Sequence, residues 1–556
     1  MSGGGRDPFV ASNYRGITLN SVLSKVLENL ILSRLEQTLI EADFPHQNQS
    51  AFRKHVGCPD AIFATQELIA RYISDGSTVH MCLFDLEKAY DSVEFAVLLD
   101  RLFSIGVNGK TWRIIRNWYE NGRCFVQVDG RSSSSFLVER GVRQGSVLSP
   151  TLFNIVMDPL LRSMEAAGIG LCVNNLYGGA YLHADDIRTV ATSVSTLQTQ
   201  ISKVLEFAST SFLNLNPSKC EIVSFAQRNS VFHPTCEIEG KCLPANGTAK
   251  CLGYFWNHDL SAKPSVEYNI MKARRAFFAY GSMGLFQGNL SPLSGRSVVE
   301  TCVLPILLYG SENWCLTESS LQLLDSFLGE LSKRLLKLPK WYSNTPASIV
   351  IGMQSARALC LTRKLQFLRK VAADNRGETV SSRTFMSLSD DIDSVCLVRE
   401  CRDLECFFEI NFTSAILDED TSCPHPREIK EEIRSRDREL RLANLAKRVD
   451  VAIINEVERN VGWPKLWDLA LDYGPRCVDG LKNLVRILTF PPHAQFACPL
   501  CEEKHLSGAR DELLSHVLDT HTTLAISGKG FLTTLKTVSD SNSVLFKQLC
   551  SLYNPF

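Results

Sequence analysis

The sequence lacks any apolar run long enough to cross a membrane, and its first residues lack the apolar core of a secretory signal. A membrane-spanning helix needs about 18 or more consecutive apolar residues, and no such run occurs in the 556 residues. The opening stretch, MSGGGRDPFV, is polar and rich in glycine, unlike a signal peptide. These absences predict an intracellular protein without membrane contact.

A charge excess of either sign and a disulfide framework are also missing. The 59 Lys and Arg residues almost balance the 60 Asp and Glu residues, for a net charge of −1. Any surface for nucleic acid must therefore be local, because opposite charges can gather on different faces. The 19 cysteines are scattered and odd in number, which favours a reducing compartment over paired disulfides.

Apolar residues make up 45% of the chain, enough for about three or four globular domains. Strand and helix patterns alternate in the first part, which implies a sheet backed by helices. We expect a helix over 21–40 with Ser21 as its N-cap, a strand over 79–84, a hairpin over 124–139 and a helix that begins at Ser149. Later regions are a basic helical stretch over 264–340, a linker or irregular excursion over 374–393, and a charged helix over 426–449.

Three carboxylates stand at strand ends in this pattern. Asp185 and Asp186 are adjacent in the hairpin YLHADDIRTV, where the pair alone fits a solvated turn. Asp85 follows the apolar strand 79–84, a position where reactive side chains are exposed. Three converging carboxylates repel one another unless a cation neutralises them, and hard oxygen ligands select Mg²⁺. Two Mg²⁺ ions about 4 Å apart stabilise phosphoryl transfer, so the set indicates nucleotidyl transfer.

Seven ordered motifs carry a family resemblance over about residues 12–340. FDLEKAYDSV, GVRQGSVLSPTLFNIVMD, HADD, LNPSKCEIV and KCLGYFW follow NYRGITLNSVLSKVLENLILSRL and QSAFRKHVGCPDAI. In this order they resemble the reverse transcriptases of non-LTR (LINE-type) retrotransposons. The resemblance implies an α+β right-hand polymerase that copies an RNA template by extending a DNA primer 3′-hydroxyl with deoxynucleoside triphosphates. It also implies action in the nucleus and cytoplasm.

The domain boundaries follow from the same resemblance. They are partial fingers over 1–80, a palm with an antiparallel sheet and inserted fingers elements over 81–258, and a helical thumb over 259–345. A mainly helical C-terminal region of unknown role covers 346–490, and a zinc-finger-like module with a tail covers 491–556. The basic helices of the thumb would track the phosphates of the template–primer duplex, although a solvated amphipathic face is the alternative.

The resemblance assigns roles to single residues. Asp85 and Asp185 would hold two Mg²⁺ ions, with Asp186 adjacent and more peripheral. Tyr90 would be a steric gate against a ribonucleotide 2′-hydroxyl, the alternative being a core aromatic. Lys219 would protonate the leaving pyrophosphate, the alternative being an exposed loop lysine.

The substrate contacts implied in the same way form two groups. Arg15 would clamp the triphosphate, and Gln144 with Gly145 would contact the incoming nucleotide, helped by the close approach that Gly141 and Gly145 permit. The alternative for this stretch is a helix-capping loop. The turn made by Leu252, Gly253 and Tyr254 would hold the primer end.

Departures from the family pattern suggest an alternative function. His183 stands where the family usually has Phe or Tyr and is expected to loosen the packing of the hairpin. Gly16 replaces a common proline, and only a short stretch precedes Asn13, which predicts an N-terminally truncated copy or a fragment of a longer polyprotein. A catalytically impaired relic that still binds RNA or DNA is therefore the alternative. An RNA-directed RNA polymerase is disfavoured by Tyr90.

The C-terminal part contains a candidate zinc site. Cys498-x₂-Cys501 is followed by His516-x₄-His521, and two thiolates with two imidazoles suit tetrahedral Zn²⁺. Fourteen residues separate Cys501 from His516, more than the twelve of the usual finger, and His505 is a spare candidate. Two core cysteines and two surface histidines are the alternative. Such a module would bind the RNA or the target DNA.

Overall fold

The computed structural model describes residues 10, 14, 16–226, 234–282, 291–374, 376–418 and 423–446, with 463, 467, 482, 496–497 and 504–505. The chain divides into two compact units, which we treat separately. Unit 1 comprises residues 1–261 and 370–399, and unit 2 comprises residues 262–369 and 400–556. Within the described residues, no helix is long and apolar enough to span a membrane.

A five-stranded sheet forms the centre of unit 1. Its strand order is β13-β10-β1-β9-β8, with β10 and β13 parallel and the other neighbours antiparallel. The strands are β1 (Val79–Phe84), β8 (Ala180–His183), β9 (Asp186–Ala191), β10 (Glu221–Phe225) and β13 (Ala245–Asn246). The strand predicted from the apolar run is confirmed as β1, whose residues are all buried.

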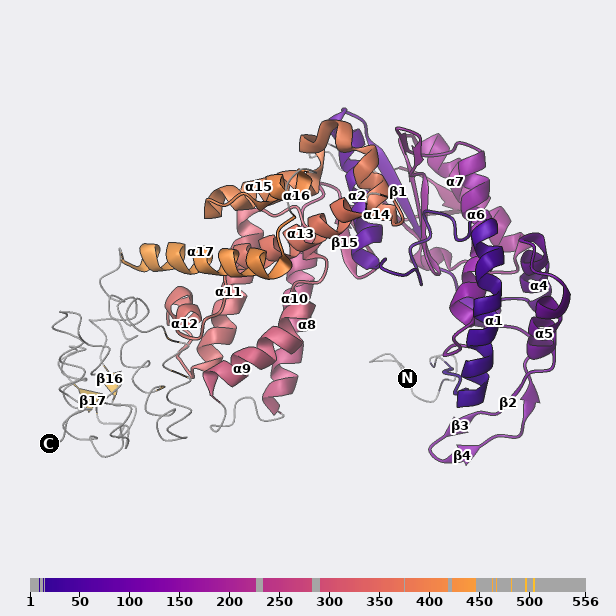
Figure 1. Cartoon of the computed structure of the whole chain (residues 1–556), viewed down its shortest axis with the longest axis horizontal. Coiled ribbons are helices and arrows are strands. Elements are labelled where there is room, and N and C mark those ends of the chain that lie inside the picture. The colour runs from indigo at the N-terminus through magenta and orange to yellow at the C-terminus, as the bar shows by residue number, and fades with distance from the viewer. Residues whose placement is uncertain are drawn as a thin grey trace. The chain divides into compact units, whose positions relative to one another are not determined.

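Helices cover both faces of this sheet, and alternation along the strands determines which side chains face which helices. Cys82, Phe84 and Ile187 join the main hydrophobic core with residues of α6 (Ser149–Ala166) and α7 (Val194–Thr210). The opposite face meets α2 (Cys58–Ser74), where the Tyr181 hydroxyl and the Arg188 guanidinium donate to main-chain carbonyls. Figure 1 shows α2 and α14 together on one side of the sheet and α6 and α7 on the other.

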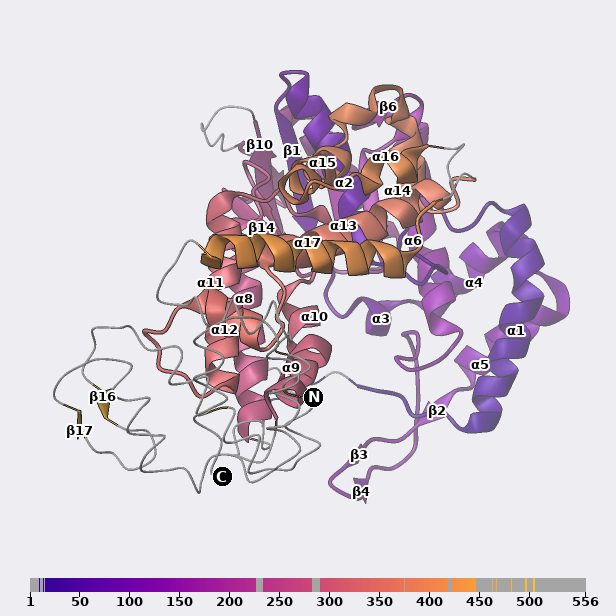
Figure 2. The same cartoon turned by 60° about the vertical axis from the view of Figure 1, so that its left-hand side comes forward.

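Further elements of unit 1 surround the sheet. Ser21 caps α1 by accepting the Ser24 N–H at 3.2 Å, so the predicted N-cap is confirmed. Asp129 and Gly130, both at positive φ, form the turn of the predicted 124–139 hairpin. The helices are α1 (Val22–Glu41), α3 (Ala89–Ser92), α4 (Phe95–Ser104) and α5 (Gly109–Glu120). Figure 2 shows α1 alongside α4 and α5, with the hairpin of β3 and β4 beyond them.

The remaining strands of unit 1 form two-stranded ribbons that carry its turns. They are β2 (Arg123–Cys124), β3 (Gln127–Val128), β4 (Arg131–Ser132), β5 (Phe136–Leu137), β6 (Cys172–Val173), β7 (Leu176–Tyr177), β11 (Glu237–Ile238), β12 (Lys241–Cys242), β14 (Thr248–Cys251) and β15 (Tyr254–Asn257).

Up to residue 446 the described part of unit 2 is mainly helical, and the predicted helical periodicity over 264–340 is confirmed where that stretch is described. Its helices include α8 (Lys263–Tyr280), α9 (Pro292–Val298), α10 (Leu304–Leu307), α11 (Glu318–Leu335), α12 (Asn344–Val350), α16 (Phe412–Leu417) and α17 (Pro426–Ala446). The predicted charged helix is α17. Two further helices, α13 (Ala356–Ala373) and α15 (Cys396–Phe408), belong partly to each unit. Residues 370–373 of α13 and 396–399 of α15 are in unit 1, and the rest of both helices is in unit 2.

The prediction of a linker over 374–393 is wrong for most of that stretch. Residues 380–387 form α14 (Val380–Ser387), and residues 389–394 form a 3₁₀ helix. Thr379 caps α14 in a capping box with Ser382, which explains the polar composition that suggested a linker. This region belongs to unit 1, so the C-terminal region predicted as one block over 346–490 is divided between the two units.

Candidate active site

The hairpin of β8 and β9 brings its carboxylates next to the end of β1. His183 pairs with Asp186 across a two-residue turn of Ala184 and Asp185, and Ala184 lies in the left-handed region at φ 57°. On the other side of β9, Phe84 is opposite Ile187. Asp85, the next residue of the chain, therefore ends its strand beside the hairpin turn. The three carboxylates that the sequence suggested thus come from adjacent strand ends.

Electrostatic coupling links these carboxylates. Burial, together with the charges of Asp185 and Asp85, raises the pKa of Asp186 to about 6, while Arg188 opposes them. Within the described residues, no three His, Cys, Asp or Glu side chains are arranged to hold a metal ion. Lys219 is a second cation next to these carboxylates, and its Nζ donates to Asp85 Oδ2 at 2.9 Å.

Backbone pairing positions Lys219 beside Asp85. The Asn216 N–H donates to the Asp85 carbonyl at 2.9 Å, and the Glu87 N–H donates to the Asn214 carbonyl at 2.8 Å. This antiparallel stretch leads into the 3₁₀ turn Pro217–Lys219. The predicted proton donor therefore contacts a predicted metal ligand directly, rather than extending from an isolated loop.

Tyr90 lies near the same turn with its ring held in place. The ring stacks on Phe153 of α6, with centroids 4.6 Å apart and planes at 17°. The hydroxyl is buried and has no hydrogen-bond partner among the described residues. Burial and the neighbouring Asp185 charge both raise the pKa of Tyr90 above its ordinary value, so the phenol stays neutral at physiological pH.

The predicted nucleotide-contact loop packs against the chain that precedes α1. The Thr18 N–H donates to the Gln144 carbonyl at 2.8 Å, and the Gln144 side chain donates to Asp91 Oδ1 at 3.2 Å. Gly145 has φ 108°, and a Cβ placed there would lie 2.7 Å from the Thr18 carbonyl oxygen. A glycine is therefore required at this position by both conformation and space.

Glu28 supports this loop and was not found from the sequence. It is fully buried on α1, where its Oε2 accepts the Val147 N–H at 2.7 Å and its Oε1 accepts the Asn20 side-chain amide at 3.1 Å. The only sequence signal is a charged residue amid the apolar positions of a helix. Glu28 fixes the loop where it leads into α6.

The predicted primer-contact turn divides into an accessible tip and a buried strand residue. Leu252 and Gly253 form the turn between β14 and β15, both at positive φ. Tyr254 is 2% exposed, and its hydroxyl donates to Gln66 of α2 at 2.9 Å. Tyr254 therefore anchors the ribbon to α2, and of the three predicted primer-contact residues only Leu252 and Gly253 lie in the turn.

His183 does not loosen the hairpin as the sequence suggested. Its Nδ1 is 2.9 Å from Ser50 Oγ, and its Nε2 is 3.7 Å from Cys58 Sγ. Burial and Arg188 lower its pKa to about 4, so the imidazole is neutral and has one donor and one acceptor nitrogen. The polar ring ties the hairpin to Ser50, which precedes α2, and to Cys58, the first residue of α2.

The other predicted site residues lie outside the described part of the chain. They are Arg15 and the four zinc candidates Cys498, Cys501, His516 and His521. The two described strands on either side of Cys498 and Cys501 in the sequence, β16 (Phe496–Ala497) and β17 (Lys504–His505), pair in an antiparallel ribbon.

Comparison with known proteins identifies what this arrangement resembles. Residues 5–260 match the family described as reverse transcriptase (RNA-dependent DNA polymerase). That range holds the five-stranded sheet, the three carboxylates, Tyr90, Lys219 and the loop around Gln144.

Three curated relatives are retrotransposon proteins. The chain is 28% identical over 340 residues to a Pol polyprotein of the type-1 retrotransposable element R2 from Popillia japonica, covering 59% of this chain and 45% of the relative. It is 34% identical over 208 residues to the Pol polyprotein of element R2DM from Drosophila melanogaster, covering 37% and 19%. It is 27% identical over 269 residues to the RNA-directed DNA polymerase of the mobile element jockey from Drosophila funebris, covering 47% and 29%. The chain thus spans less than half the length of each.

Proposed function

We propose that this chain, whose residues 5–260 match the reverse transcriptase family, is an RNA-directed DNA polymerase of a non-LTR retrotransposon. The reaction is extension of a primer 3′-hydroxyl with deoxynucleoside triphosphates on an RNA template. The observation that carries the proposal is the meeting of Asp85 with the Asp185–Asp186 hairpin at adjacent strand ends.

The donor set fits Mg²⁺ by its chemistry. Carboxylate oxygens are hard ligands. Burial first, and then the charges of Asp185 and Asp85, raise the pKa of Asp186, and a bound cation would favour its charged form. Asp85 and Asp185 would hold two ions, with Asp186 alongside. When bound, Mg²⁺ would supply positive charge that stabilises the attacking and leaving oxygens.

The protein's own side chains would perform the remaining tasks. Lys219, already within hydrogen-bonding distance of Asp85, would turn to the pyrophosphate and donate a proton as it leaves. The loop of Gln144 and Gly145 would hold the incoming nucleotide, and the ring of Tyr90 would exclude a 2′-hydroxyl. Leu252 and Gly253 would contact the primer end.

A C-terminal nucleic-acid module belongs to the same proposal. Cys498, Cys501, His516 and His521 would hold one Zn²⁺, since two thiolates and two imidazoles suit a tetrahedral site. The module would then bind the element RNA or the target DNA.

Primer extension tests the proposed activity. The full chain is incubated with a DNA primer annealed to an RNA template, Mg²⁺ and all four deoxynucleoside triphosphates, and the products are sized. We expect template-directed extension that stops when Mg²⁺ is chelated. Nucleic-acid binding without any extension would instead favour the catalytically impaired relic.

Replacing Tyr90 with alanine is expected to relax discrimination against ribonucleotides by about 10- to 100-fold, because a pocket excludes an added hydroxyl mainly through its shape. The measurement is the ratio of kcat/KM for a deoxynucleotide and the matching ribonucleotide. Tyr90→Phe is the matched control, since the Tyr90 hydroxyl has no hydrogen-bond partner among the described residues. Equal discrimination by Tyr90→Ala and the wild type would remove the gate role.

Replacing Lys219 with methionine is expected to lower two kinetic quantities. Loss of a general acid should lower kcat about 100-fold. The Mg²⁺ concentration for half-maximal activity should fall, because Lys219 no longer competes for Asp85. A Mg²⁺ titration of primer extension measures both, with Lys241→Met as an exposed-lysine control. An unchanged kcat would contradict the proposed role.

A further inference from the structure

Residues 370–399, which we name the return segment, pack against the polymerase part of the chain although they lie beyond the family match. They belong to unit 1, whereas the match ends at residue 260. Their helix α14 lies beside α2, as Figure 1 shows. The contacts described below involve buried side chains. Through them the return segment packs close to the β8–β9 hairpin that carries Asp185 and Asp186, which we name the catalytic hairpin.

One anchor of the return segment is the first turn of α2. Asp60 is 1% exposed, and its two carboxylate oxygens accept from Lys370 Nζ at 2.7 and 2.8 Å. Ser381 Oγ of α14 donates to the same carboxylate at 2.6 Å. A buried carboxylate needs such partners, and here the return segment supplies the only cation within salt-bridge distance among the described residues.

A second anchor lies two helical turns further along α2. Glu67 is buried and accepts the Cys396 N–H at 2.7 Å and the Leu397 N–H at 2.9 Å. These N–H groups belong to the first turn of α15, where main-chain donors lack partners inside their own helix. Because Asp60 and Glu67 are seven residues apart, they share one face of α2, and the return segment holds that face at two points.

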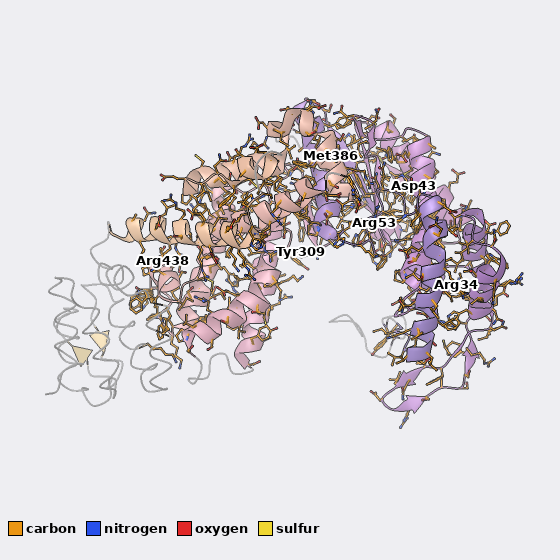
Figure 3. All side chains as sticks on the ribbon, viewed as in Figure 1. Arg34, Asp43, Arg53, Tyr309, Met386 and Arg438 are labelled. Carbon is orange, nitrogen blue, oxygen red and sulfur yellow. The ribbon has the colours of Figure 1, made fainter. Side chains whose placement is uncertain are left out.

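The return segment also holds the chain just before α2. Arg383 of α14 donates to the Gln47 carbonyl at 3.0 Å. In the reverse direction Arg53, labelled in Figure 3, donates to the Glu378 carbonyl at 3.1 Å. Gln47 directly precedes the stretch 48–50 and Arg53 follows it, so the return segment contacts the chain on both sides of this stretch.

Residues 48–50 in turn hold the hairpin that carries the carboxylates. The Leu182 N–H donates to the Asn48 carbonyl, and the Ser50 N–H donates to the Leu182 carbonyl, both at 3.0 Å. Gln49 Oε1 accepts the Ala184 N–H at 3.2 Å, directly before Asp185. The stretch 48–50 thus extends the sheet beyond β8 and contacts the turn itself.

We propose that the return segment is a positioning element for the catalytic hairpin, acting through Gln47 and the stretch 48–50 on Ala184 and Asp185. The proposal rests on the proposed polymerase function for its kinetic consequence, but its structural consequence is independent of activity. The residues required to place the catalytic carboxylates therefore include a segment of chain outside the family match.

The test uses full-length Arg383→Ala and Lys370→Met with two readouts. The first is hydrogen–deuterium exchange of peptides that cover 46–51 and 180–187, without nucleic acid. We expect about tenfold faster exchange there, with α4 and α5 unchanged, as for a local opening. The second is primer extension, where we expect kcat to fall about 10- to 100-fold while the KM for deoxynucleotides is unchanged, since the loop at Gln144 is untouched.

Two further variants sharpen the result. Asp60→Asn combined with Lys370→Met removes both charges and should recover much of the kcat lost in Lys370→Met. Asp391→Ala removes an exposed ion pair between the return segment and Arg71 and should change neither readout. Unchanged hairpin exchange in Arg383→Ala and Lys370→Met, or a rise shared equally by α4 and α5, would overturn the proposal. If the wild type shows no primer extension, the proposed polymerase function is refuted. The positioning role of the return segment is then still decided by the hydrogen–deuterium exchange result.

Discussion

Asp185→Asn is expected to lower the kcat of primer extension by about 1,000-fold, the kinetic equivalent of several kcal/mol of lost charge stabilisation. Asn keeps the size of the side chain but cannot neutralise a divalent cation. Asp185 lies in the turn between β8 and β9, so its replacement leaves the packing of the hydrophobic core unchanged. Steady-state kinetics with saturating primer–template measure the loss.

Thermal unfolding distinguishes this loss from misfolding. Asp185 raises the pKa of the neighbouring Asp186 by repulsion, so removing its charge should leave the Tm equal or higher at pH 7. Asp75→Asn, at the exposed end of α2, is the matched control and should retain activity. Incorporation by Asp185→Asn at the wild-type rate would refute the assignment of the metal site.

Gly145→Ala is expected to lower kcat/KM for deoxynucleotides by about 100-fold, since displacing a substrate-positioning group by about 1 Å has an effect of this size. The alanine Cβ would lie 2.7 Å from the Thr18 carbonyl oxygen, a backbone atom that cannot rotate away. The loop at Gln144 must therefore separate from the chain before α1, and the bond between Thr18 and Gln144 would break.

Gly76→Ala is the matched control for Gly145→Ala. Gly76 also has a positive φ, 84°, but a Cβ there meets nothing within 4 Å. Both variants carry the conformational cost of about 1–2 kcal/mol for a left-handed residue, and only Gly145→Ala carries the clash. Equal activity of the two variants would show that the contact at Thr18 has no part in nucleotide binding.

Local patterns were enough to predict the elements that carry the candidate site. The apolar run of β1, the serine cap of α1 and the Asp-Gly turn of the 124–139 hairpin are each determined by neighbours in sequence. Asp85 could be joined to Asp185 and Asp186 only because each stands at a strand end, and pairing in the sheet brings those ends together.

Contacts between distant residues were beyond such reasoning. Glu28 meets Val147, and Asp60 meets Lys370, across 119 and 310 positions of the chain. A buried carboxylate cannot be told from a solvated one by its own neighbours, because its partners come from the tertiary fold. The polar stretch 374–393 misled for a different reason, because Thr379 and Ser382 form a local capping box at the start of a helix and are not part of a linker.

The two anchors on α2 also set an order of events during synthesis. The partners of Asp60 and Glu67 lie in the return segment, which follows more than a hundred residues of unit 2. At about 5–20 residues per second, the ribosome takes on the order of five to twenty seconds to make that stretch. Throughout this interval α2 has no return segment to pack against, so Asp60 and Glu67 lack these partners. The β8–β9 hairpin likewise lacks the contacts that the return segment makes through Gln47. Unit 1 therefore completes its folding only after residues 262–369 of unit 2 have been made.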